Sequence, residues 1–209
     1  MVKKVVSFLM VLMMTISLVA CGQSTNNSKD SSETDSKVTE TTNTSQQSSS
    51  NKKILIAYFS WSGNTKKMAN TIKENVGGDI LEIKPSNPYP TDYSECGDVA
   101  KEERDNNARP KIANLPKSID EYDTIFIGYP IWWHTAPMII GTFLESYDLT
   151  GKDVYPFTQS AAMDNEHFEN SMKFVKQSAK NATVHDGLYV NASETNEIIS
   201  YLNKNGFGK

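Results

Sequence analysis

The chain has 209 residues and a formal net charge of −4 at pH 7, with 25 acidic residues against 21 basic ones. Binding to a nucleic-acid backbone needs an excess of basic residues, so we expect no nucleic-acid partner. The three histidines, His134, His167 and His185, lie far apart and lack the spacing typical of metal ligands, so we expect no metal site.

The first twenty residues have the features of an export signal. Two lysines, Lys3 and Lys4, precede an apolar stretch that is too short and wrongly flanked for a membrane span. The stretch ends in LVACG, which resembles the lipobox of bacterial lipoprotein signal peptides. This resemblance implies removal of residues 1–20 and a lipid on the sulfur of Cys21, so that acyl chains anchor the protein on the extracytoplasmic side of the cell membrane. A chance cysteine after a secretory signal and an uncleaved anchor are the alternatives.

Residues 22–51 consist almost wholly of Ser, Thr, Asn and Gln with scattered charges, and Val38 is their only aliphatic residue. Such a tract cannot bury enough apolar surface to offset chain entropy, which predicts a disordered linker over residues 21–51. The first fifty residues contain four lysines and four acidic residues, so the net negative charge belongs to the remaining domain. This domain, residues 52–209, has the size of one ordinary domain.

A continuous apolar run over residues 54–59 is followed by a hydroxyl-rich turn and then by a helical pattern over residues 65–76. The run is rich in β-branched and aromatic residues without alternation, as is typical of a strand buried on both faces of a parallel sheet. The free N–H groups and the positive dipole end at the start of the helix predict an anion site, most naturally for phosphate. The candidate binding residues are Ser60, Trp61, Ser62, Gly63, Asn64 and Thr65.

This turn lacks both the GxxxxGK[ST] pattern of a Walker A loop and the GxGxxG pattern of dinucleotide-binding folds. Its pattern Phe-Ser-x-Ser-Gly-Asn-Thr after a buried strand resembles the FMN-phosphate loop of the flavodoxin family. The resemblance implies that residues 60–65 bind the phosphate of FMN through side-chain oxygens and backbone N–H groups. The alternative is a serine-rich turn that caps an ordinary helix.

Residues 93–106 carry a dense pattern of charges, which predicts an exposed helix that crosses back over the sheet. We interpret these charges as a solvated helix face. The alternative is a surface for a substrate or partner. Under either interpretation, Tyr89 and Tyr93 are candidates to line a cleft. Cys96 has no partner for a disulfide once Cys21 carries a lipid, and a single helical cysteine is more often a small buried residue than a reactive thiol.

A second buried strand is expected over residues 122–128, followed by a Pro-bounded loop with two adjacent tryptophans. Indole faces suit a flat heteroaromatic ring. The loop is similar to the YPxWWxxxP loop that covers the isoalloxazine ring in a flavodoxin-like subfamily, and Gly128 would allow close approach of the backbone. We would expect glycine where this chain has His134. The candidate residues are Pro130, Ile131, Trp132, Trp133 and His134.

The other elements are expected as a strand over 79–84 near the sheet edge, helices over 137–147, 166–179 and 193–202, a strand over 154–157 and a divided strand over 184–190. A third ligand loop would begin with Thr158, Gln159 and Ser160, where relatives usually have a Cys- and Gly-rich sequence. Alternating strands and helices predict an α/β fold with a parallel sheet wound on both faces. The resemblance specifies a flavodoxin-like three-layer sandwich with five parallel strands in the order 2-1-3-4-5.

The three candidate loops follow the carboxyl ends of strands one, three and four, where ligands of open α/β sheets bind. The resemblance therefore implies a membrane-anchored FMN protein that transfers electrons to a redox partner protein or a small acceptor. No catalytic side chain is required, because the flavin performs the chemistry. The alternatives are an NAD(P)H-dependent FMN or quinone reductase of the same fold and a non-catalytic ligand-binding or scaffold lipoprotein that has lost flavin.

Overall fold

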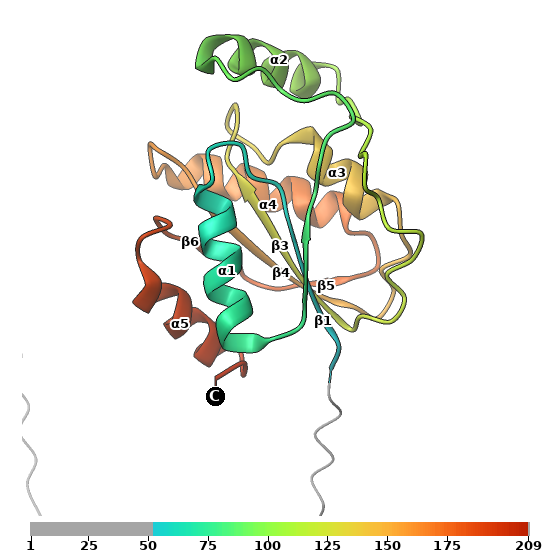
Figure 1. Cartoon of the computed structure of the whole chain (residues 1–209), viewed down its shortest axis with the longest axis vertical. Helices are drawn as coiled ribbons and strands as arrows, with labels where there is room; N and C mark the ends of the chain where they lie inside the picture. The colour runs from blue at the N-terminus through green and yellow to red at the C-terminus, as the bar shows by residue number, and fades with distance from the viewer. Residues whose placement is uncertain (1–51, 209) are drawn as a thin grey trace, which may run out of the picture. The chain divides into compact units, whose positions relative to one another are not determined.

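A parallel sheet runs through the part of the chain that the computed structural model describes, residues 52–208 (Figure 1). Its strands lie in the order β2-β1-β3-β4-β5, and β6 also pairs with β4. The strands are β1 (Ile54–Tyr58), β2 (Asp79–Glu82), β3 (Thr124–Pro130), β4 (Asp153–Gln159), β5 (Thr183–Val184) and β6 (Leu188–Tyr189). The predicted order is confirmed, as are the edge position of β2 and the division of the last strand. The predicted signal peptide, Cys21 and linker lie outside the described residues.

Helices cover both faces of the sheet. They are α1 (Asn64–Val76), α2 (Tyr93–Asp105), α3 (Met138–Glu145), α4 (Asn165–Ser178) and α5 (Thr195–Lys204). Helices α1 and α5 pack against one face, and α3 and α4 pack against the other, whereas α2 lies beyond the carboxyl ends of the strands (Figure 1). Within residues 52–208, none of these helices has the length and apolar character needed to cross a membrane.

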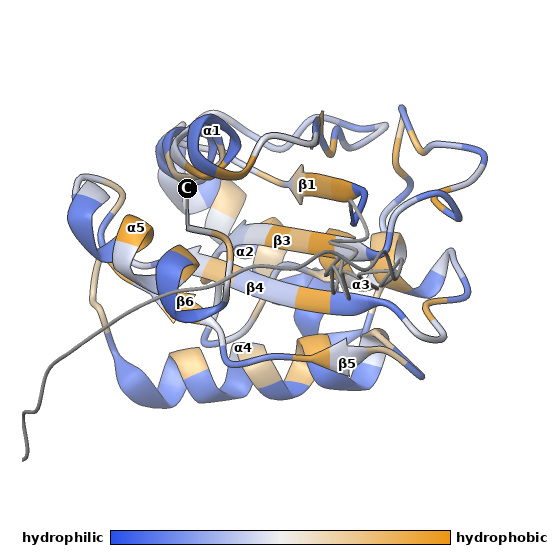
Figure 2. Ribbon diagram, turned by 90° about the horizontal axis from the view of Figure 1, so that it is seen from below, coloured by the Kyte–Doolittle hydropathy of each residue, from blue (hydrophilic) through white to orange (hydrophobic). Residues whose placement is uncertain are grey.

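The apolar run of β1 explains why both faces of the sheet need helices. Leu55 and Ala57 belong to the hydrophobic cluster under α3 and α4, whereas Ile56 and Tyr58 belong to the cluster under α1 and α5. Successive side chains of a strand point to opposite faces, so an apolar run without alternation is stable only when both faces are covered. Figure 2 shows the hydrophobic residues gathered along the strands and the hydrophilic ones on the outer sides of the helices.

The strands that lead to the second and third loops are longer than predicted. Pro130 is the last residue of β3 and pairs with Gln159, which is the last residue of β4. Thr158 is also part of β4, and its hydroxyl donates to the Tyr129 carbonyl at 2.5 Å. The expectation that Thr158 and Gln159 start a loop is therefore wrong, because pairing between β3 and β4 continues to this point. The third loop begins at Ser160.

Gly128 has a different role from the one that the sequence suggested. A Cβ atom at this position would lie 2.1 Å from Cζ of Phe157, whose Cα pairs with that of Gly128 across the two strands. The absence of a side chain therefore makes room for the Phe157 ring within the core. The glycine serves packing between β3 and β4 rather than close approach to a ligand.

An acidic residue at the amino end of β4 links two partners. The Asp153 carboxylate accepts from Lys52 Nζ at 2.7 Å and lies 2.8 Å from Nε2 of His185. Burial raises the pKa of Asp153, but the hydrogen bonds from Lys52 and His185 outweigh this effect and leave the pKa below its ordinary value. The carboxylate therefore stabilises the fold at neutral pH, and this stabilisation is lost as the pH falls below about 4, through the folded-state pKa.

Asp153→Asn should lower the free energy of unfolding by about 1 kcal/mol at pH 7, because the pair is partly exposed to solvent. The difference between variant and wild type should shrink in acid, where the wild-type carboxyl is also neutral. Urea unfolding of both proteins at pH 7 and at about pH 2, well below the ordinary pKa of an aspartate, measures this change. Asp186→Asn is the matched control, since Asp186 is in none of the ion pairs found within residues 52–208. An equal deficit at both pH values would contradict the assignment.

Candidate functional site

Three segments meet at the carboxyl edge of the sheet. They are the turn of residues 60–65 after β1, residues 131–137 after β3 and residues 160–164 after β4. Strands β2 and β3 lie on opposite sides of β1, so the connections from β1 and β3 leave the sheet in opposite directions at this edge. Such a reversal opens a crevice in doubly wound sheets.

The turn of residues 60–65 is built around a serine and a glycine. The Ser60 hydroxyl accepts from the backbone N–H groups of Gly63 at 3.1 Å and Lys66 at 3.3 Å, and it thereby ties the turn to the first residues of α1. Gly63 has a φ of 89°, a conformation that costs a glycine nothing and other residues considerably more. Ser62 and Asn64 are exposed beside it. The turn is thus fixed while the side chains of Ser62 and Asn64 face solvent.

Thr65 is the most informative residue of this turn. It is only 1% exposed, and its hydroxyl oxygen is buried without a hydrogen-bond partner among the described residues. A buried hydroxyl left unpaired costs about 1–3 kcal/mol, so such groups usually have a partner. The first N–H groups of α1 also lack partners within the helix. A phosphate oxygen at the helix start would pair with both, so these residues fit the phosphate group of a cofactor.

Aromatic side chains connect this turn to the loop after β3. The Trp132 ring lies edge-on to Phe59, Tyr89 and Trp61, with ring centroids 5.2, 5.0 and 6.5 Å apart. Trp61 in turn donates from Nε1 to the Pro90 carbonyl at 2.9 Å. Trp132 therefore packs inward on the turn of residues 60–65, which we call the phosphate turn after the ligand expected there. The sequence did not show that Trp132 and Trp133 would differ in this way.

Residues 132–135 form a tight turn with unusual backbone angles. Trp132 and Thr135 exchange two backbone hydrogen bonds of 2.9 and 3.1 Å, and the two residues between them have φ values of 42° for Trp133 and 67° for His134. Positive φ at both central positions is typical of type I′ turns, which favour Asn-Gly. Each non-glycine residue held there costs roughly 1–2 kcal/mol. The glycine expected in place of His134 would avoid that cost.

A cavity of about 520 Å³ opens between the phosphate turn, the loop after β3 and α2. Its volume is in the range of small-molecule sites. It is lined by Trp61, Ile131, Trp132, Trp133 and His134 and, from α2, by Tyr93, Ser94, Cys96, Gly97, Asp98 and Ala100. Three indoles and a phenol around one cavity suit a flat aromatic ring. We call this space the ring cavity.

The interpretation of α2 as a solvated helix face is incomplete, because this helix forms one wall of the ring cavity. Several of its charges do face solvent, but Gly97 lies against the second tryptophan of the loop, whose Nε1 donates to the Gly97 carbonyl. A Cβ atom at Gly97 would lie 3.8 Å from that nitrogen. Tyr93 was expected to line a cleft and does line this cavity, and the glycine inside the charged helix is a sequence signal that could have indicated this wall.

The predicted residues of the third loop lie apart from the ring cavity, which none of Thr158, Gln159 and Ser160 lines. The carbonyl of Gln159 accepts from the Ile131 N–H at 3.1 Å, so the end of β4 supports the loop after β3. Ser160 accepts from the Ala162 N–H at 3.4 Å. Gln159 therefore acts on the site through its backbone carbonyl, whereas Ser160 binds within its own loop.

Titratable groups near the cavity are partly shielded from solvent. Tyr89 donates to the Glu103 carboxylate at 2.8 Å, and burial raises the pKa of Glu103 although this hydrogen bond lowers it. Burial also raises the pKa of the Cys96 thiol, so this cysteine is a poor nucleophile at neutral pH. Within residues 52–208, no group of three or more His, Cys, Asp or Glu side chains is arranged to hold a metal ion.

Comparison with known proteins agrees with this architecture. No curated protein is significantly similar to the chain. A proposed flavoprotein from Bacteroides eggerthii is 35% identical with a TM-score of 0.65, and the match covers 73% of this chain and 96% of that one. A proposed flavoprotein from Bacteroides uniformis is 33% identical with a TM-score of 0.66, and the match covers 73% of this chain and 98% of that one.

A flavoprotein from Lactobacillus acidophilus, solved in complex with FMN, is 30% identical with a TM-score of 0.59. The match covers 70% of this chain and 97% of that protein. A family model described as flavodoxin matches residues 53–205, which is nearly the whole of the domain. This chain therefore belongs to the flavodoxin family.

Proposed function

We propose that this protein binds FMN at the carboxyl edge of its sheet and transfers electrons through it. The observation that carries the proposal is the buried Thr65 hydroxyl, which has no partner among residues 52–208 and lies at the start of α1. The FMN bound by the Lactobacillus acidophilus relative supports the choice of cofactor. FMN supplies the redox chemistry when bound, whereas the protein supplies binding, orientation and electrostatics.

At the phosphate end, the side chains of Ser62, Asn64 and Thr65 and the free N–H groups of the helix start would hold the anion. Ser60 would act mainly through the turn, since its hydroxyl already accepts two backbone N–H groups. The positive end of the α1 dipole favours a negative group there. No basic side chain from within the turn is needed.

At the ring end, the aromatic walls of the ring cavity would hold the isoalloxazine and keep water from it. Trp61 connects the two ends, because it belongs to the phosphate turn and also lines the cavity. The backbone of residues 131–134 presents peptide groups at the same wall, and these can orient the polar edge of a bound ring. Electrons would pass to a redox partner protein or a small acceptor.

We further propose that Cys21 carries a lipid that tethers the domain outside the cytoplasm. The LVACG pattern and the polar tract after it support this proposal. Partition of the wild type and Cys21→Ser between detergent and aqueous phases tests it. The wild type should enter the detergent phase and the variant should stay in the aqueous phase. Equal partition of the two proteins would contradict lipidation.

The absorption spectrum of the purified protein tests the cofactor. We expect a yellow protein whose released flavin is FMN, and flavin-free protein should bind FMN more tightly than riboflavin because the latter lacks the phosphate. A colourless protein that takes up neither flavin would instead support the non-catalytic scaffold. Equal affinity for FMN and riboflavin would place the phosphate away from residues 60–65.

Steady turnover separates an electron carrier from a reductase. The flavin-loaded protein should reduce a quinone only slowly with NADPH or NADH, because the sequence has no second phosphate-binding loop and no basic cluster suited to a 2′-phosphate. Rapid turnover with either nucleotide and no added protein would favour the NAD(P)H-dependent reductase. Reduction that requires a partner protein would favour the carrier.

A further inference from the structure

The turn of residues 132–135 needs support, because two non-glycine residues hold positive φ at its centre. Strained backbone persists only where the surrounding structure determines it, and such positions cluster at functional sites. The two backbone hydrogen bonds between Trp132 and Thr135 close the turn but do not fix the peptide between Trp133 and His134. Other contacts must therefore hold this peptide.

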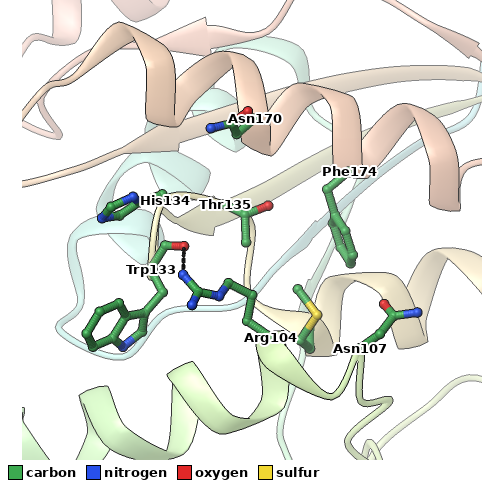
Figure 3. Close-up of a pocket in the computed structure, with 8 residues that line it drawn as sticks. Arg104, Asn107, Trp133, His134, Thr135, Asn170 and Phe174 are labelled. Atoms are coloured by element: carbon green, nitrogen blue, oxygen red, sulfur yellow. Dashed lines mark hydrogen bonds between the residues drawn. The ribbon is translucent and has the colours of Figure 1, made fainter.

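Helix α2 provides contacts on one side of the turn. Nη1 of Arg104 donates to the Trp133 carbonyl at 3.1 Å, the bond drawn as a dashed line in Figure 3. The guanidinium carbon of Arg104 also lies 5.5 Å from the centre of the Trp133 ring. The same indole donates from Nε1 to the Gly97 carbonyl. Both the carbonyl and the side chain of Trp133 are thus bound to α2.

The guanidinium of Arg104 is itself held in place. Its Nε and Nη2 donate to Oδ1 of Asp105 at 2.9 and 2.6 Å, so Nη1 is left to face the turn.

On the other side of the turn, the His134 ring stacks on His167 of α4 with 3.9 Å between ring centroids. Figure 3 shows Arg104 beside the turn, at the edge of a separate cavity of about 330 Å³.

We propose that Arg104 is a positioning residue for the ring cavity. By binding the Trp133 carbonyl, it keeps residues 132–135 in the positive-φ turn and so fixes the wall against which the flavin ring would lie. A charged, planar donor suits this role, because its hydrogen bond to the carbonyl is strong and its direction is set by Asp105. The part of the inference that concerns flavin rests on the proposed function.

The flavin-free protein tests the structural half of the inference. The chain has three tryptophans, all at this site, so the NMR spectrum should show three indole N–H signals, and Trp133→Phe identifies the one from Trp133. In Arg104→Gln, the Trp133 signal should shift and exchange faster with solvent. In the control Lys101→Gln it should not, because Lys101 faces the same ring at 6.0 Å without binding the backbone, and it binds Oδ2 of Asp105 rather than the Oδ1 that accepts from Arg104.

Flavin titrations test the functional half. Arg104→Gln should weaken FMN and riboflavin by the same factor, roughly tenfold, which is the scale of one lost charge-assisted hydrogen bond. A loss at the phosphate end would affect FMN alone. Lys101→Gln removes an equal charge and should change neither affinity appreciably. The flavin affinity of Arg104→Lys should lie between those of the wild type and Arg104→Gln, because lysine keeps the charge but lacks the planar set of donors of arginine.

A double variant separates positioning from a general loss of stability. Glycine relieves the strain at residue 134, so Arg104→Gln should cost less flavin affinity in a His134→Gly background than in the wild type. Thermal unfolding of each variant shows whether the substitution lowers the stability of the whole domain. If Arg104→Gln folds poorly, the comparison rests on Arg104→Lys, whose Trp133 signal should still move.

The outcomes distinguish the two proposals. A wild type that binds no flavin, together with a Trp133 signal that responds to Arg104→Gln, would end the proposed function but keep Arg104 as a support of the turn. An unchanged Trp133 signal in Arg104→Gln and Arg104→Lys would overturn the inference. Equal effects of Lys101→Gln and Arg104→Gln on flavin affinity would overturn it too, because charge alone would then explain the loss.

Discussion

Thr65→Val should weaken FMN binding by roughly tenfold to a hundredfold and leave riboflavin binding nearly constant. Valine keeps the branched shape but removes the hydroxyl, so one hydrogen bond to a charged group, worth about 1.5–3 kcal/mol, is lost. The hydroxyl is buried and has no other partner among residues 52–208, so no alternative contact compensates. Titration of flavin-free protein with each flavin gives both affinities.

The same substitution should have the opposite effect on the flavin-free protein. Removing an unpaired buried hydroxyl should raise the free energy of unfolding by about 1 kcal/mol, which urea unfolding can measure. Thr71→Val is the matched control on the same helix, because the Thr71 hydroxyl already donates to the Lys67 carbonyl at 3.2 Å and lies away from the turn. An equal loss of FMN and riboflavin affinity in Thr65→Val would place the phosphate elsewhere.

Trp132→Ala should lower the free energy of unfolding by about 2–4 kcal/mol and should also weaken FMN binding by about 1–3 kcal/mol. The indole packs against three other aromatic rings, so its removal leaves a gap in a partly buried cluster. Trp61 and the phosphate turn lose a neighbour at the same time. Urea unfolding of the flavin-free protein and flavin titration measure the two effects separately.

Trp133→Ala is the matched comparison, because its side chain is 38% exposed and lies against α2 rather than the aromatic cluster. We expect it to reduce stability by only about 1 kcal/mol. An indole in contact with a flavin quenches its fluorescence by electron transfer, so each variant that removes a contacting indole should brighten bound FMN. If neither substitution changes affinity or fluorescence, these tryptophans are not part of the flavin site.

One turn determines the directions in which the two neighbouring tryptophans point. They are neighbours in the sequence, but the turn of residues 132–135 sends Trp132 toward Phe59 and Trp133 toward Gly97 of α2. The two single substitutions are therefore expected to act on different parts of the protein. We expect Trp132 to act on both the aromatic cluster and the ring cavity that it lines, and Trp133 to act mainly through its contacts with α2.

The sequence by itself determined the order and type of the helices and strands in the described domain. The apolar run of β1 requires two covered faces, and a glycine after Ser62 permits the positive φ of the phosphate turn. These are local properties, because an apolar run or a turn residue restricts its own backbone and neighbours directly. The ends of β3 and β4 were predicted too early in the chain, because pairing between these two strands extends both of them.

Only the tertiary structure decided how α2, the loop after β3 and α4 meet around the candidate site. The bond from Arg104 to Trp133 and the stack of His134 on His167 join residues about thirty positions apart. The charges of α2 predicted an exposed helix, but its inner side closes the ring cavity. Such contacts depend on the packing of whole elements, which no local pattern records. The sequence therefore identified the turn of residues 60–65 as a candidate phosphate site, and the fold showed which side chains surround the ring cavity.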